Sequence, residues 1–257
     1  MPNHVPVAVV GVGVKAPGGT TVSSLWTSVC AGYSSAKRYD DPRMPDGAVA
    51  LVSEVDGFDP ANYASAAELR RLDRSHLLAI AAAQDAIDSM TGALPEPERC
   101  AVVVGTGFGA TATYETQYTR LLESGMRALS PLVIPLVMPN ATASLLSMRF
   151  GFKGPCLTVS TACASGATAL GEGVELLRRG AADVVIAGGV DSMINFNAMC
   201  SFMRLDVMSR NVSHPAQASR PFDVDRDGFV MGEGAGFCEV IQCCAGAMRV
   251  DMTDVAR

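Results

Sequence analysis

The segment Ser160-Thr-Ala-Cys163-Ala-Ser165-Gly166 is the part of the sequence best suited to covalent chemistry. A short apolar strand, Leu157-Thr-Val159, ends just before it, and a helical pattern begins just after it. Cys163 is therefore expected at a strand-to-helix elbow, where small neighbours admit a substrate and the helix N-terminus offers free amides and partial positive charge. Both features favour a thiolate nucleophile. The local pattern is equally compatible with a buried, inert cysteine, which is what we expect for most of the other seven cysteines.

Two further motifs imitate binding sites. Gly11-Val-Gly13-Val-Lys-Ala16 fits the G-x-G-x-x-A dinucleotide fingerprint, but Pro17-Gly18-Gly19 delays the helix that would receive a pyrophosphate. No acidic residue stands about twenty residues on, where a ribose hydroxyl would be held. We interpret the glycines as a tight strand-to-helix turn. An NAD-dependent oxidoreductase stays a weak alternative.

The second motif, Asp223-Val-Asp225-Arg-Asp227-Gly228, resembles the start of a calcium-binding EF-hand loop. Its twelfth position is Gly234, with Glu233 one place early, and the glycines nearby indicate a flexible exit. We predict a turn whose carboxylates cap local amides, and neither a metal site nor a bound cofactor.

The three histidines are far apart in the sequence, and we interpret each as structural or solvated. His76 lies inside a helical pattern and His214 precedes a proline. Ser165 lies in Cys-Ala-Ser-Gly and not in G-x-S-x-G, so no Ser/His/Asp triad can be assembled.

Five apolar, β-branched runs separated by helical patterns indicate an α/β layered sheet with strands buried on both faces. These runs are Val5–Val14, Cys100–Gly105, Cys156–Ser160, Asp183–Gly189 and Gly236–Ile241. Three helices are expected between them. Thr21–Ala31 has one apolar face with Trp26, the capping box at Ser65 opens a long helical segment through Leu69 to Ile87, and the third helix is Ser165–Arg179.

Composition narrows the class of protein. Apolar residues make up 49 % and charged residues 18 % of the 257 residues, which is typical of a globular chain with a large core. The net charge of −6 argues against nucleic-acid binding. The uncharged stretch 128–148 is interrupted by three prolines, so a buried, bent loop followed by a core helix is expected instead of a membrane span. Scattered cysteines and no signal-peptide shape favour a cytoplasmic location.

From about Val7 to Ile241 the chain resembles the N-terminal half of the β-ketoacyl-ACP synthases, most closely the elongating type II kind. Ordered motifs over nearly the whole chain carry the resemblance. They include Gly105-Thr-Gly-Phe-Gly109, Asn140-Ala-Thr-Ala143, Gly154-Pro-Cys-Leu-Thr-Val-Ser-Thr-Ala-Cys163-Ala-Ser-Gly166, Ala182-Asp-Val-Val-Ile-Ala-Gly-Gly189 and Ser219-Arg-Pro-Phe-Asp-Val-Asp-Arg-Asp-Gly-Phe-Val-Met-Gly-Glu-Gly-Ala-Gly236.

The resemblance implies a thiolase-like fold, here the N-terminal half of a five-layered αβαβα body, with a mixed five-stranded sheet and helices. It implies a β-ketoacyl synthase N-terminal domain over residues 1–242, followed by a divergent tail, 243–257, of unknown role. It also implies that the strand Cys156–Ser160 pairs with its twin across a homodimer two-fold axis.

The implied chemistry is acyl transfer. Cys163 would accept an acyl group from an acyl carrier protein thioester, and condensation with malonyl-ACP would give a 3-oxoacyl-ACP of fatty-acid or polyketide synthesis. The backbone amide of Cys163 would supply one oxyanion donor. No cofactor is required, because phosphopantetheine arrives on the carrier protein. Phe108 and Phe202 match positions that line the acyl tunnel, and the phenyl ring of Phe108 should favour short acyl groups.

One departure bears on activity. The family's catalytic histidines, its buried lysine and its second oxyanion loop lie in the C-terminal half, and none of the three histidines here matches them. We therefore expect condensation to be lost and slow acylation of Cys163 to survive. A truncated or frameshifted product, a splice form, or a subunit with a separate C-terminal partner would each account for the pattern. The alternative function is a non-catalytic module that binds acyl carrier protein or a ketosynthase.

Overall fold

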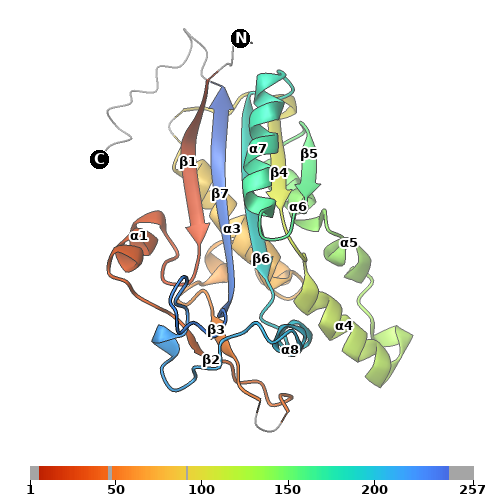
Figure 1. Ribbon diagram of the computed structural model, residues 1–257. Helices are drawn as coiled ribbons and strands as arrows, with labels where there is room; N and C mark the ends of the chain where they lie inside the picture. The colour runs from red at the N-terminus through yellow and green to blue at the C-terminus, as the bar shows by residue number, and fades with distance from the viewer. Residues whose placement is uncertain (1–5, 46–47, 91, 243–257) are drawn as a thin grey trace.

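A computed structural model describes residues 6–45, 48–90 and 92–242, and these residues form a mixed sheet covered by helices on both faces (Figure 1). The predicted tail 243–257 lies outside the described residues. The sheet has seven strands within the described part, two of them short. They are β1 (Val7–Lys15), β2 (Lys37–Arg38), β3 (Leu51–Ser53), β4 (Cys100–Gly105), β5 (Cys156–Val159), β6 (Val184–Ser192) and β7 (Met231–Gln242).

The five predicted strands lie in the order β1-β7-β6-β4-β5. β4 runs parallel to both β5 and β6, whereas β7 is antiparallel to β6 and to β1. The short β3 extends the sheet beside the start of β7, and β2 pairs with β3. Because β4, β5 and β6 are parallel, their carboxyl ends lie at the same end of the sheet, which is the usual location of functional loops in such sheets.

Helices cover the two faces of the sheet (Figure 1). α3 and α6 pack on one face, around a core that contains Ile80, Val102 and Ile186, and α7 packs on the other, around Val103, Leu176 and Val185. The α-helices are α1 (Val22–Cys30), α2 (Ala66–Leu69), α3 (Arg74–Asp88), α4 (Thr111–Ser124), α5 (Val133–Val137), α6 (Ala141–Phe150), α7 (Ser165–Arg178) and α8 (Phe196–Arg204).

Burial on both faces holds for the central strands only. Every residue of β4 is buried, but Val9 and Val12 in β1 are 50 % and 41 % exposed, and Leu157 in β5 is 38 % exposed. The expectation was wrong for these two strands because each pairs along only one of its edges.

The long helix expected from Ser65 is two helices. The capping box at Ser65 forms as expected and opens α2, but a second box at Asp73 opens α3. Asp73 accepts a hydrogen bond from the Ser75 amide at 2.9 Å, and the His76 ring accepts one from the Asp73 amide at 3.3 Å. A competing N-cap therefore interrupts the helix, although the apolar spacing continues across it.

The glycines of the dinucleotide-like motif do not form the predicted turn. Gly11 and Gly13 lie within β1, where an added Cβ would stand only about 2.0 Å and 1.9 Å from carbonyl oxygens of α3. They permit close contact between strand and helix. The turn follows them, between Ala16 and Gly19, which exchange two backbone hydrogen bonds of 3.0 Å.

The aspartate loop is a local turn, as predicted. Asp223 accepts the Asp225 amide at 2.8 Å, and Asp227 accepts the Ser209 hydroxyl and the Arg210 amide at 2.7 and 2.9 Å. Its exit is ordered, contrary to the expectation, because Gly232, Gly234 and Gly236 belong to β7.

The uncharged stretch 128–148 contains α5 and then most of α6, in agreement with a bent segment that leads into a core helix. The bend is half-exposed and not buried as expected. Over the residues that the structure describes, no helix combines the length and the apolar character needed to cross a membrane. The apolar face of α1 forms but faces solvent, and Trp26 is 67 % exposed.

Candidate active site

Cys163 lies at the predicted elbow between β5 and α7. Its side chain is exposed. The preceding residue, Ala162, has a φ of +52°, a left-handed backbone conformation that residues other than glycine rarely adopt. The Ser165 hydroxyl holds this bend closed, because it accepts the Thr161 amide at 2.9 Å and donates to the Ala162 carbonyl oxygen at 2.6 Å.

Close backbone packing fixes the helix N-terminus over the sheet. A Cβ added to Gly105, the last residue of β4, would lie 2.2 Å from the Ser165 carbonyl oxygen. A Cβ on Gly189 of β6 would lie 2.8 Å from the Cα of Gly166. The N-cap residue Ala164 makes no side-chain cap, so the first amides of α7 have no side-chain acceptor there. The Ala164 and Ser165 amides already donate to the Thr161 and Ala162 carbonyl oxygens, at 3.1 Å each. The donors that remain open at this helix N-terminus are therefore the next amides, those of Gly166 and Ala167.

Four of the other thiols are less suited to nucleophilic attack. Burial raises the pKa of Cys100 to about 11, and it also raises the pKa of Cys156, Cys200 and Cys238. A raised thiol pKa leaves less thiolate at neutral pH. Of these four, Cys100 is buried as expected, whereas Cys156 is exposed and Cys200 and Cys238 are half-buried.

The loop 106–109 after β4 runs alongside the elbow. The Thr106 amide donates to the Val159 carbonyl oxygen at 3.1 Å, and a Cβ on Gly107 would lie 3.9 Å from the Ala162 carbonyl oxygen. The Asp191 carboxylate anchors this loop from β6. It accepts the Thr106 hydroxyl, the Gly107 amide and the Phe108 amide at 2.8, 2.8 and 3.1 Å.

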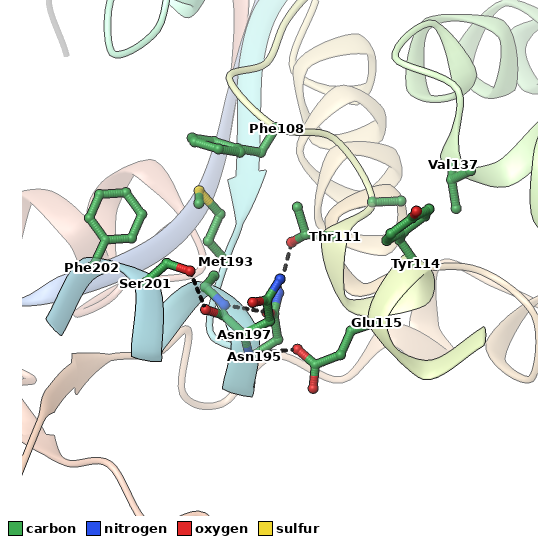
Figure 2. A pocket seen from close by; sticks show the side chains of 12 residues that line it. Phe108, Thr111, Tyr114, Glu115, Val137, Met193, Asn195, Asn197, Ser201 and Phe202 are labelled. Atoms are coloured by element: carbon green, nitrogen blue, oxygen red, sulfur yellow. Dashed lines mark hydrogen bonds between the residues drawn. The ribbon is translucent and has the colours of Figure 1, made fainter. Parts of the chain in front are cut away.

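The anchored loop presents Phe108 to a second aromatic side chain. The rings of Phe108 and Phe202 meet edge to face with centroids 6.4 Å apart, and Phe202 contacts Phe229 in the same manner at 5.7 Å. Phe108 and Phe202 both line a pocket of about 340 Å³ between α4 and α8 (Figure 2). The structure thus brings together the two predicted tunnel residues, one on the loop after β4 and one on α8, in a pocket that Cys163 itself does not line.

Polar side chains line the part of the pocket farther from Phe108 (Figure 2). The Asn195 amide group donates to the Thr111 hydroxyl at 2.8 Å, and its oxygen caps α8 by accepting the Ala198 amide. Glu115 of α4 accepts the Asn197 backbone amide at 2.8 Å. α4 and α8 are therefore tied together across the pocket.

A charged network supports this polar end from outside. Arg43 forms a 2.7 Å ion pair with Glu115 and a bidentate pair with Asp41, and its guanidinium lies 4.6 Å from the centre of the Phe196 ring. Arg43 lowers the pKa of Asp41, mainly through their side-chain hydrogen bonds. Burial, together with a hydrogen bond to Asp41, raises the pKa of Tyr39.

Neither of the two described histidines lines the pocket. His76 is buried in α3, where burial lowers its pKa, and His214 precedes a short 3₁₀ turn that starts at Pro215. Across the described ranges, no three histidine, cysteine, aspartate or glutamate side chains are grouped closely enough to hold a metal ion.

Several residues of the site were not predicted from the sequence. Asp191 could have been found, because it follows the buried part of a strand next to β4, at the edge where parallel strands end. The pairing of Arg43 with Glu115 had no local signal, because 72 residues separate the two side chains.

Comparisons with known proteins agree with this arrangement. Residues 4–241 match the model of the beta-ketoacyl synthase N-terminal domain. The chain is 34 % identical over 232 residues to a 3-oxoacyl-[acyl-carrier-protein] synthase 2 of Synechocystis, covering 90 % of this chain and 56 % of the relative. The chain therefore spans about half the length of the curated relatives it matches.

Two solved structures have the same fold over most of the chain. A beta-ketoacyl synthase from Burkholderia phymatum superposes with a TM-score of 0.78 at 25 % identity, covering 92 % of this chain and 59 % of that one. The ishigamide ketosynthase/chain length factor superposes with a TM-score of 0.80 at 25 % identity, covering 98 % and 60 %.

Proposed function

Because this chain belongs to the β-ketoacyl synthase family, we propose that it is an acyltransferase whose Cys163 accepts an acyl group from an acyl carrier protein thioester. The observation that carries the proposal is the exposed Cys163 on a strained elbow, directly before the N-terminus of α7.

The transfer uses a single covalent exchange. The Cys163 sulfur attacks the thioester carbonyl carbon, the carbon–sulfur bond to the carrier breaks, and the carrier thiol leaves with the proton that Cys163 has lost. Negative charge develops on the carbonyl oxygen, and the Cys163 amide supplies one donor that stabilises it. Phosphopantetheine enters on the carrier protein, so the step needs no cofactor bound to this chain.

Condensation with malonyl-ACP is the reaction that the name of the Synechocystis relative implies for a whole protein. We propose it for this chain only together with a C-terminal half, because an enolate needs additional donors aimed at its oxygen. The half could come from a partner chain. We further propose that the chain forms a homodimer through the edge strand β5, which the exposure of Leu157 on that strand supports. We also propose a cytoplasmic location.

Intact-mass spectrometry tests the proposal directly. The chain is mixed with acyl-ACP, with and without malonyl-ACP, and Cys163→Ser is the matched control. We expect an acyl adduct on the wild-type chain that Cys163→Ser lacks, without 3-oxoacyl product. No adduct on Cys163, with the carrier still bound, would refute the acyltransferase and favour the non-catalytic module.

A further inference from the structure

The pocket beside the elbow changes character along its length. Phe108, Phe202 and Met193 lie on one side, near the anchored loop, whereas Asn195, Asn197 and Glu115 gather at the opposite part, and Tyr114 and Val137 line a third side (Figure 2). No residue of the elbow lines the pocket. An alkyl chain from Cys163 would enter it only past Phe108, and it would then lie between Met193 and the amide groups of Asn195 and Asn197.

Most polar groups at this end already have partners. Both carboxylate oxygens of Glu115 are engaged, one by Arg43 and one by the Asn197 backbone amide. The Ser201 hydroxyl donates to the Asn197 carbonyl oxygen at 2.8 Å. The side-chain amide of Asn197 is different: it lines the pocket, it belongs to an exposed residue, and within the described residues it makes no hydrogen bond to the protein, so water is its partner when the pocket is empty.

The end of the pocket therefore presents an amide donor and acceptor that an alkyl chain would cover without replacing their hydrogen bonds to water. An occupant with an oxygen at that position would keep the amide hydrogen-bonded. A site with polar groups discriminates against the analogue that leaves them unpaired.

We propose that this pocket selects acyl groups that carry a hydroxyl or oxo oxygen at the end remote from the thioester, with Asn197 as the specificity-determining residue. The inference rests on the proposed acyl transfer for its biological substrate. It does not depend on that transfer for its test, because the pocket can be probed through the Cys163 thiol alone.

The probes are alkyl methanethiosulfonates with butyl, hexyl and octyl chains, each paired with its terminally hydroxylated analogue. Such reagents form a mixed disulfide with a thiolate and release methanesulfinate, so no carrier protein is needed. Peptide mass spectrometry follows the rate at Cys163, and the exposed Cys30 in the same chain reports the intrinsic difference between paired reagents.

For each reagent pair, we divide the reaction rate of the hydroxylated reagent by that of its alkyl partner. At one chain length, we expect this ratio to be about three- to tenfold higher at Cys163 than at Cys30, the range of one neutral hydrogen bond. Asn197→Leu and Asn197→Ala should each remove this gain, and both keep the backbone amide that Glu115 accepts. Asn211→Leu, in a loop away from the pocket lining, should retain it.

An equal reagent ratio at Cys163 and Cys30 for every chain length would overturn the proposal, and so would a gain that survives both Asn197 substitutions. A hydroxyl preference without any acylation by acyl-ACP would instead refute the proposed function and leave the pocket inference standing.

Discussion

At the scale of single residues, the conformation of Ala162 aims the nucleophile. Its φ of +52° costs an alanine about 1 kcal/mol relative to glycine, which adopts this region freely. Ala162→Gly should therefore leave the free energy of unfolding unchanged or raise it by less than about 1 kcal/mol. The acylation rate of Cys163 should nevertheless fall, because the bend becomes less rigid. Urea denaturation and the mass-spectrometric loading assay measure the two quantities.

Ala167→Gly is the matched control for that prediction, since Ala167 lies in the first turn of α7, in the right-handed helical region, where replacing alanine with glycine costs up to about 1 kcal/mol. If Ala162→Gly destabilised the chain as much as this control, the left-handed bend would not be a source of strain.

The residues of the site differ in how far the sequence alone could identify them. Cys163 could be singled out from its neighbours, because small residues between a strand and a helix are a local pattern; its role as the nucleophile came from the family resemblance and stays a prediction. Phe108 and Phe202 came only from the family resemblance; their contact spans loops that no periodicity connects. Asn197 was missed because only the packing of α4 and α8 shows that its side-chain amide lines the pocket without a hydrogen bond to the protein.

At the scale of elements, the packing of α7 on β4 decides where the elbow stands. Gly105→Ala would push a Cβ to within 2.2 Å of the Ser165 carbonyl oxygen, so we expect a loss of about 2 kcal/mol or more in stability and slower loading of Cys163. Gly171→Ala is its counterpart on the open side of the same helix, where no atom lies within 4 Å of an added Cβ. The free energy of unfolding of Gly171→Ala should exceed that of the wild type by about 1 kcal/mol.

Both variants are compared with the wild-type chain by urea denaturation. Similar changes in stability for Gly105→Ala and Gly171→Ala would contradict the claim that backbone contact at Gly105 seats the helix.

The elements themselves were largely predictable. The thiolase-like α/β class is confirmed, and so are the five long strands, because continuous apolar runs are strong signals. The short strands β2 and β3 were missed, since two or three residues carry no period. The break at Asp73 was missed because the apolar spacing continues across it, and only the capping hydrogen bonds reveal the second helix start.

At the scale of the whole molecule, one buried carboxyl should control how stability depends on pH. Glu239 of β7 is fully buried, and among the described residues neither of its carboxyl oxygens has a hydrogen-bond partner. Burial raises its pKa from 4.5 to about 7. Between these two pH values the unfolded chain releases the proton of Glu239 and the folded chain keeps it. The free energy of unfolding therefore falls as the pH rises, and this fall ends above about pH 7.

The gap between the two pKa values corresponds to about 3 kcal/mol. Glu239→Gln cannot ionise at this position. Its free energy of unfolding minus that of the wild type should therefore increase by about 2–3 kcal/mol from about pH 5 to about pH 8. Urea denaturation across this range measures the difference. Glu175→Gln, at a side chain that is 60 % exposed, should follow the wild type throughout. Parallel pH profiles for wild type and Glu239→Gln would mean that the buried carboxyl titrates alike in both states, and that another group sets the pH response of the sheet.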